Sequence, residues 1–222
     1  MKLILDTADT KAISKFNEYL ALDGVTTNPT ILTRSGRDYK EVIEEILSIL
    51  DENQALYVQV VSEDYEGIVE DAKWVNSLRG GKNVYAKIPV TNEGLKAIKT
   101  VRSLGIKVLA TAIYSMDQAY LAMKAGANAL APYVNRMCYY TDGIEEVIKM
   151  QTVIDNYGFD CEIIAASFKN AAQVRELMLN GIGAATVPVD VIEQLFTNVN
   201  TNDAVKNFSA DWKKAYNKNT LR

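Results

Sequence analysis

The segment Asn83-Val84-Tyr85-Ala86-Lys87-Ile88-Pro89 has the composition of a short buried β-strand, and it carries a single charged side chain. Lysine is almost never fully buried without a partner. Burial removes water from an ammonium group and favours the neutral amine, which attacks carbonyl carbons and forms Schiff bases. An ordinary explanation competes, because Lys87 can also reach solvent or pair with a carboxylate. The surrounding sequence has to decide between them.

This strand is one of eight short apolar runs that alternate with longer amphipathic segments. We expect strands at residues 3–5, 25–27, 56–61, 84–88, 107–112, 127–131, 162–165 and 184–187, and helices near 9–20, 38–50, 65–79, 92–104, 115–125, 142–156, 170–180 and 189–196. Ser115 and Asp142 begin helices with capping-box spacing, and Gly105, Gly126 and Gly181 stand where helices end. Eight such repeats predict an α/β fold, a single (β/α)₈ TIM barrel.

The main competing fold is an open doubly wound sheet. No strand is followed by the Gly-x-Gly-x-x-Gly turn that would favour dinucleotide binding in such a sheet. No low-complexity linker interrupts the chain, so we expect one domain over residues 1–222, with the barrel at 1–197. Residues 198–222 should form an additional C-terminal helix and tail, because Val205, Phe208, Trp212 and Ala215 recur at helical spacing. This apolar face packs either on its own barrel or on another subunit.

Composition narrows the possible partners and compartment. The chain has 222 residues, 48% of them hydrophobic, and a formal charge of -4, which gives no sign of a nucleic-acid or membrane partner. No apolar run reaches membrane-span length. An acidic residue at position 6 comes too early for a secretory signal, and two cysteines suggest no disulfide framework. We therefore expect a cytoplasmic protein.

The absence of histidine narrows the chemistry further. It excludes Ser-His-Asp and Cys-His catalysis in their usual forms, and zinc bound by histidine. A metal bound only by carboxylates remains open, but the sequence calls for no cofactor and no metal. Acid–base steps must then use Asp, Glu, Tyr, Lys or water.

Polar residues gather just after the ends of the predicted strands, where a barrel keeps its functional groups. They are Asp6, Thr26, Thr27, Asn28, Gln59, Lys87, Thr111, Tyr133, Arg136, Ser167 and Lys169. Each has an ordinary explanation alone: Asn28 can cap a turn, Thr111 suits a strand, and Lys169 suits a solvated surface. Together they would meet at one mouth of the barrel.

If Lys87 attacks a carbonyl, the remaining polar residues have matching tasks. Losing water from the carbinolamine needs proton transfers, for which Asp6 and Tyr133 are candidates, while Gln59 and Thr111 position a water. A second set suits substrate binding. Asn28 can orient a substrate hydroxyl, and Arg136 and Ser167 can donate hydrogen bonds to a phosphate.

Four segments resemble motifs of the transaldolase family. They are residues 24–30 (Gly-Val-Thr-Thr-Asn-Pro-Thr), 84–91 (Val-Tyr-Ala-Lys-Ile-Pro-Val-Thr), 131–136 (Ala-Pro-Tyr-Val-Asn-Arg) and 165–169 (Ala-Ala-Ser-Phe-Lys). The resemblance covers essentially the whole chain and implies a metal-free class I aldolase barrel. It implies an imine between Lys87 and a dihydroxyacetone unit. Asp6, Thr26 and Asn28 would line the donor pocket, Arg136 and Ser167 would hold phosphate, and Lys169 matches a basic position.

Within this family, three positions resemble the fructose-6-phosphate aldolases. Transaldolases usually carry Glu, Phe and often Ser where this chain has Gln59, Tyr133 and Ala131. We therefore expect cleavage of fructose 6-phosphate to dihydroxyacetone and glyceraldehyde 3-phosphate. Two alternatives stay open: a transaldolase of the pentose phosphate pathway, and a barrel that binds sugar phosphates without turnover. The resemblance also implies a homo-oligomer, a pentamer or decamer, in which the terminal helix contacts a neighbour.

Overall fold

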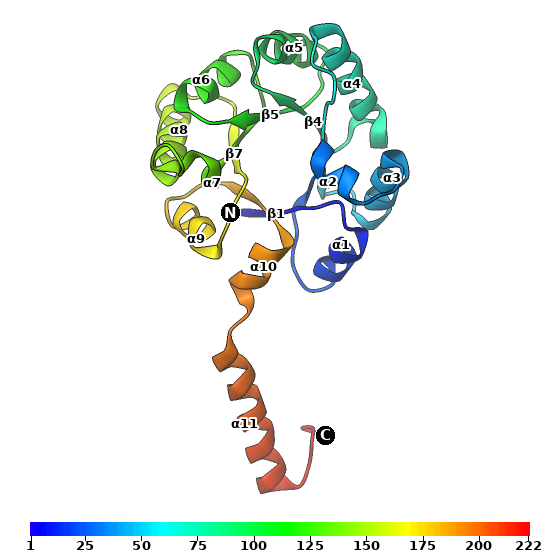
Figure 1. Ribbon diagram of the computed structural model, residues 1–222. Helices are drawn as coiled ribbons and strands as arrows, with labels where there is room; N and C mark the ends of the chain where they lie inside the picture. The colour runs from blue at the N-terminus through cyan, green and yellow to red at the C-terminus, as the bar shows by residue number, and fades with distance from the viewer.

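Eight parallel strands close into a barrel in the computed structural model, which describes residues 1–222 (Figure 1). The strands follow one another around the ring in sequence order, and β1 pairs with β8 to close it. Their bounds are β1 Lys2–Asp6, β2 Gly24–Thr26, β3 Ala55–Gln59, β4 Val84–Pro89, β5 Val108–Ile113, β6 Ala129–Pro132, β7 Glu162–Ala165 and β8 Ala184–Val187. The predicted (β/α)₈ barrel is confirmed.

Eleven α-helices accompany the strands, and all but the last surround the barrel (Figure 1). They are α1 Thr10–Asn17, α2 Pro29–Arg34, α3 Tyr39–Ile49, α4 Tyr65–Ser77, α5 Asn92–Ser103, α6 Met116–Lys124, α7 Val134–Met137, α8 Gly143–Tyr157, α9 Ala171–Leu179, α10 Val189–Phe196 and α11 Val199–Tyr216, with a 3₁₀ turn η1 at Leu78–Gly81. No helix is both long enough and apolar enough to cross a bilayer.

Alternation of side chains along each strand divides the core into two parts. Outward residues such as Ala86 and Ile88 of β4 share a core with Ala97 and Ile98 of α5. The inner cluster is smaller, and more than half of its buried members are alanine: Ile4, Ala55, Tyr57, Leu109, Ala129, Ala131, Ile164, Ala166 and Ala184. Alanine on the inner face leaves room for larger polar side chains at the mouth.

Local signals set the element boundaries largely as predicted. The Ser115 and Asp142 side chains accept hydrogen bonds from amides of the first turns of α6 and α8. Gly105, Gly126 and Gly181 adopt φ values of 77°, 92° and 79°, which glycine tolerates at a helix end.

Some boundaries differ from the prediction. Strand β3 ends at Gln59 rather than at residue 61, because the Asp71 carboxylate accepts the amides of Val61 and Ser62, at 2.9 and 2.8 Å, in place of a strand neighbour. Helices α2 and α7 were not predicted, since six and four residues are too few to carry an amphipathic period. Helix α11, Val199–Tyr216, lies within the segment 198–222 that was expected to form a C-terminal helix and tail.

Helix α11 extends away from the barrel, and the end of the chain folds back along it (Figure 1). None of its residues is buried, and Phe208 is 70% exposed. The apolar face predicted from the sequence is therefore present, but it does not pack on its own barrel.

Candidate functional site

Five of the predicted site residues share the inner face of the barrel. Each stands two residues after a member of the inner cluster, or after a side chain packed against it, and therefore points to the same side of the sheet. The pairs are Ile4 and Asp6, Tyr57 and Gln59, Tyr85 and Lys87, Leu109 and Thr111, and Ala131 and Tyr133. Period-two alternation thus gathers residues from four strands, and the residue that follows a fifth, at one end of the interior.

Lys87 is buried, with 4% of its surface exposed. Its Nζ donates a hydrogen bond of 2.7 Å to the carbonyl oxygen of Thr27, which follows β2. Burial lowers the pKa of Lys87 below its ordinary value, and the negative charge of Asp6 opposes that shift. No carboxylate lies within salt-bridge distance of the amine, so the ordinary surface explanation for this lysine is wrong.

A chain of hydroxyl groups supports Asp6. The Thr26 hydroxyl donates to Asp6 Oδ1 at 2.7 Å and also contacts the Thr186 hydroxyl. Because Thr26 has one hydroxyl proton and gives it to Asp6, Thr186 must donate to Thr26. Both threonines are buried, so the chain orders the carboxylate from inside the barrel.

Gln59 presents a buried acceptor toward the same interior. Its backbone pairs in register with Lys87 on β4. The Oε1 atom is buried and has no hydrogen-bond partner. Native proteins rarely leave such an atom unpaired, so a donor from a ligand or water suits this position.

Tyr133 and Thr111 form a second polar pair. The Thr111 hydroxyl donates to the Tyr133 hydroxyl at 3.3 Å, which leaves the tyrosine proton free to donate elsewhere. Burial raises the pKa of Tyr133, although the Thr111 hydrogen bond and the charge of Arg136 act in the opposite direction. A raised pKa keeps the phenol protonated near neutral pH.

A bulge in β5 makes space for Tyr133. The register with β6 shifts between Ala110 and Ile113, and Ala112 adopts a left-handed φ of 56°. The extra residue lets Thr111 face inward while Ile113 turns to the outer core. Without the bulge, alternation would send Ile113 into the site.

Arg136 lies on the rim, over the ring of Tyr133. Its guanidinium is 4.7 Å from that ring's centroid, and Nη1 donates to the Tyr114 hydroxyl at 2.8 Å. Tyr114 and Tyr133 meet edge to face at 5.5 Å. Two aromatic residues therefore orient the guanidinium and leave several of its N–H donors unpaired.

The remaining predicted residues occupy neighbouring loops. Ser167 has a left-handed φ of 61°, and its carbonyl accepts the Asn135 amide at 3.0 Å, which links the loops after β6 and β7. Asn28 Oδ1 accepts the Ile31 amide at 2.9 Å and caps the start of α2, where the sequence suggested a turn cap, while its side-chain N–H groups stay free. Lys169 is exposed, and its side chain makes no hydrogen bond or ion pair.

Three contributors were not singled out from the sequence. Thr186 follows Ala184 by two residues, so the same alternation would have placed it inside the barrel. Tyr114 follows the end of β5 and was also detectable as a polar residue at a strand end. The Thr27 carbonyl could not be recognised from the sequence as a partner of Lys87, because every residue has a backbone carbonyl.

Together these groups offer a definite set of chemical functions. The interior holds the buried amine of Lys87, the carboxylate of Asp6, the Tyr133 phenol, which can donate a hydrogen bond, and the unpaired amide oxygen of Gln59. A guanidinium stands at the rim. No group of three or more His, Cys, Asp or Glu side chains is placed to hold a metal ion.

Comparison with known proteins gives a consistent result. A family model described as transaldolase/fructose-6-phosphate aldolase matches residues 3–219. A protein of Geotalea uraniireducens named probable transaldolase is 41% identical over 215 residues, or 96% of this chain and 99% of that protein. One of Aquifex aeolicus with the same name is also 41% identical, over 96% of this chain and 97% of its own. One of Methanococcus maripaludis, again named probable transaldolase, is 39% identical over 98% and 100%.

Solved structures share the fold at low identity. A chain described as native KDPGal superposes with a TM-score of 0.60 at 15% identity, covering 93% of this chain and 97% of that one. A chain of a designed cube-shaped protein cage superposes with a TM-score of 0.60 at 14% identity, covering 97% and 78%. At such identities the likeness concerns the fold alone.

The Thr186–Thr26–Asp6 chain leads to a stability prediction. Thr186→Val keeps the side chain's shape but removes the donor to Thr26, so the free energy of unfolding should fall by about 1 kcal/mol. Thr186→Ser retains the hydroxyl and serves as the matched control. Urea denaturation measures both variants. A valine variant as stable as the wild type would show that this hydrogen bond contributes nothing.

Proposed function

Because the chain belongs to the transaldolase/fructose-6-phosphate aldolase family, we propose that it transfers a dihydroxyacetone unit between sugar phosphates through an imine on Lys87. The observation that carries the proposal is the buried Lys87 amine, whose pKa is lowered by its surroundings and which has no carboxylate partner. Such an amine is neutral more often than a surface lysine, and only the neutral form has a lone pair for attack.

Imine formation would use the groups around Lys87. The amine attacks the ketone carbon of the substrate, and the carbonyl oxygen becomes a hydroxyl of the carbinolamine. Loss of that hydroxyl as water requires a proton, which Tyr133 can supply because its own hydroxyl accepts from Thr111 and keeps its proton free. The unpaired Oε1 of Gln59 can accept a hydrogen bond from the departing water.

Carbon–carbon cleavage would then use Asp6. The positively charged imine draws the electron pair of the adjacent carbon–carbon bond and becomes an enamine. The hydroxyl on the far carbon gives its proton to Asp6 and becomes the carbonyl of the departing aldose phosphate. Thr26 donates to Asp6 Oδ1, which leaves Oδ2 to receive the proton. Attack of the enamine on a second aldose phosphate reverses these steps and completes the transfer.

The rim residues would bind the rest of the substrate. Arg136 has unpaired N–H donors and a fixed orientation, which suit the phosphate of the aldose part. Ser167 lies in the adjoining loop and adds a hydroxyl, while Lys169 offers an exposed positive charge. Asn28 keeps its side-chain N–H groups free for a hydroxyl of the donor unit.

Transfer is preferred to simple aldol cleavage because the relatives that cover nearly the whole chain are named probable transaldolase. This reverses the order expected from the sequence motifs. The aldolase remains a second candidate on one specific ground. The Tyr133 hydroxyl and the Gln59 amide can deliver water or a proton to the enamine, which would release free dihydroxyacetone.

The two reactions separate in a product assay. With fructose 6-phosphate alone, a transaldolase stops after one turnover, since the enamine has no acceptor. Adding erythrose 4-phosphate should therefore raise the steady rate of glyceraldehyde 3-phosphate release at least about tenfold. Continuous release at the same rate without the acceptor would identify the aldolase instead.

Lys87→Met provides the control for that assay, because it removes the amine but keeps an unbranched side chain. It should abolish both activities and also the borohydride-reducible adduct with dihydroxyacetone. Wild-type protein that forms no adduct would instead be a barrel that binds sugar phosphates without turnover.

The lowered pKa of Lys87 gives a pH prediction. As pH rises, the fraction of neutral amine grows until pH passes the folded-state pKa, and it then levels off. The initial rate of cyanoborohydride trapping with dihydroxyacetone should therefore reach half of its maximum below pH 10.5, the ordinary pKa of lysine. Asp6→Asn removes the charge that holds this pKa up, so its plateau should begin at a lower pH. A half-maximal rate reached only at pH 10.5 or above in the wild type would rule out a depressed pKa.

We also propose a modular organisation, with a catalytic barrel over residues 1–197 and a subunit contact over 198–222. Val199, Val205 and Phe208 are exposed on α11, and Trp212 has a buried Nε1 without an acceptor. Covering these groups with a second copy of the chain would remove apolar surface from water. Light scattering at micromolar concentration should give a pentamer or decamer, and a monomer would contradict the proposal. A cytoplasmic location stays a prediction.

A further inference from the structure

Gln173 connects the two loops that carry the proposed phosphate ligands, and none of the steps above uses it. It lies in the first turn of α9, which follows β7. Its Oε1 accepts the Lys169 amide at 2.8 Å, and its Nε2 donates to Asn135 Oδ1 at 3.1 Å. Asn135 directly precedes Arg136, and Lys169 follows Ser167 by two residues. One half-buried side chain therefore bridges the segments after β6 and β7.

The two ends of the Gln173 side chain cannot be exchanged. The Lys169 amide is a backbone N–H and can only donate, so the atom of Gln173 that meets it must be the oxygen. The NH₂ group then faces Asn135, which must accept through its own side-chain oxygen. The same nitrogen lies 4.0 Å from Cys138 Sγ, a weak acceptor. Gln173 therefore needs both an acceptor and a donor to make this bridge.

The backbone that Gln173 holds is in an unfavourable conformation. Ser167 has a left-handed φ of 61°, which a residue with a side chain adopts only when its surroundings fix it. On one side, the Ser167 carbonyl accepts the Asn135 amide at 3.0 Å. On the other side, the Gln173 side chain holds the Lys169 amide. The turn that directs the Ser167 side chain is thus fixed from both sides.

We infer that Gln173 is a positioning residue for binding of the aldose phosphate. By joining Asn135 to Lys169, it sets the distance between the Arg136 guanidinium and the Ser167 hydroxyl, which belong to different segments. Two groups that bind one phosphate depend on this distance, because a displacement of about 1 Å is enough to weaken a positioned contact. The inference rests on the phosphate-binding role proposed for Arg136 and Ser167.

Gln173 should act on the phosphate and not on the imine. It makes no hydrogen bond to Lys87 or Asp6, whose partners are the Thr27 carbonyl and the Thr26 hydroxyl. Loss of Gln173 should therefore weaken fructose 6-phosphate, which carries the aldose phosphate, and spare dihydroxyacetone, which has none.

Reductive trapping on the full-length protein tests the inference. Each variant is treated with cyanoborohydride and increasing fructose 6-phosphate or dihydroxyacetone, and total labelling of Lys87 is followed by peptide mass spectrometry. The measured ratio is the half-saturating concentration of fructose 6-phosphate divided by that of dihydroxyacetone. Gln173→Met keeps an unbranched side chain but removes both polar ends, so it should raise this ratio about fivefold or more.

A double-mutant cycle with Asn135 tests the bridge itself. Asn135→Ala removes the acceptor of Gln173 Nε2 and retains the backbone bond to Ser167, so it should raise the ratio about threefold or more. The double variant should be no worse than Gln173→Met alone, because both changes break the same bond. Effects that multiply would show independent action and overturn the inference. Asn135→Ala decides the matter alone if Gln173→Met does not fold.

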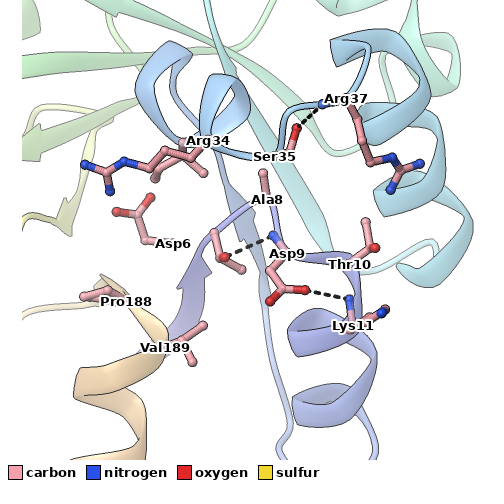
Figure 2. Close-up of a pocket in the computed structure, with 12 residues that line it drawn as sticks. Asp6, Ala8, Asp9, Thr10, Lys11, Arg34, Ser35, Arg37, Pro188 and Val189 are labelled. Carbon is pink, nitrogen blue, oxygen red and sulfur yellow. Dashed lines mark hydrogen bonds between the residues drawn. The ribbon is translucent and has the colours of Figure 1, made fainter.

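Two control variants separate this effect from changes elsewhere. Gln194→Met removes a bond of 3.3 Å from α10 to the Ala171 amide at the start of α9, and leaves both loops untouched. Arg34→Gln removes a cation on the opposite side of the mouth, after β2, in a polar cavity of about 600 Å³ beside Asp6 (Figure 2). Neither variant should change the ratio.

Arg136→Gln provides the reference, and it should raise the ratio at least as much as Gln173→Met. The inference is overturned if Gln173→Met leaves the ratio unchanged, or if either control raises it equally. An unchanged ratio in Arg136→Gln would instead refute the phosphate site proposed above. Wild type labelled by neither ligand would refute the imine on Lys87, which is a separate failure.

Discussion

The amine of Lys87 is held inside the barrel by one hydrogen bond to a backbone carbonyl, and not by a carboxylate. A carboxylate in contact would stabilise the ammonium form and remove the nucleophile. A carbonyl acceptor satisfies one N–H group while adding only a dipole. The charge of Asp6 is near enough to act on the pKa of the amine in the upward direction, but the Asp6 carboxylate accepts its hydrogen bond from the Thr26 hydroxyl. The site therefore depends on holding the Asp6 carboxylate close to the Lys87 amine without an ion pair between them.

The barrel meets this constraint through its choice of inner residues. Alanine at many inward positions leaves space, and tyrosine or threonine at others supplies hydroxyl groups. The bulge at Ala112 turns Ile113 outward, so that Tyr133 has room beside Thr111. A left-handed alanine costs on the order of 1 kcal/mol. The strained residue thus lies next to the proposed reaction centre, where the bulge keeps the Ile113 side chain out of the site.

Much of this arrangement was predictable from sequence, because alternation along strands is a strong and regular constraint. The eight expected strands placed Asp6, Gln59, Lys87, Thr111 and Tyr133 at one mouth of the barrel because all lie at strand ends, and alternation explains why the structure turns them to the inner face. A capping role for Asn28 was also expected, but at a turn, whereas the residue caps the unpredicted helix α2.

What escaped prediction has physical reasons. The Thr27 carbonyl is a backbone group, present at every residue. Helix α2 is too short for a periodic pattern, so nothing in the sequence indicated it. The linked backbones of Asn135 and Ser167 depend on a left-handed residue that is not glycine.

Pairing of β1 with β8 has a further consequence for how the molecule is made. Lys2 pairs with Ala184, so the ring joins residues from opposite ends of the barrel sequence. Contacts between residues this distant in sequence form slowly, because the conformational entropy of closing a long loop is lost before the contacts stabilise the fold. During synthesis, β1 stays an open edge until β8 leaves the ribosome. Thr186 belongs to β8, so the row of hydrogen-bonded hydroxyl groups behind Asp6 is completed only when β8 has been made. A partly synthesised polypeptide therefore holds Lys87 without the ordered Asp6 carboxylate.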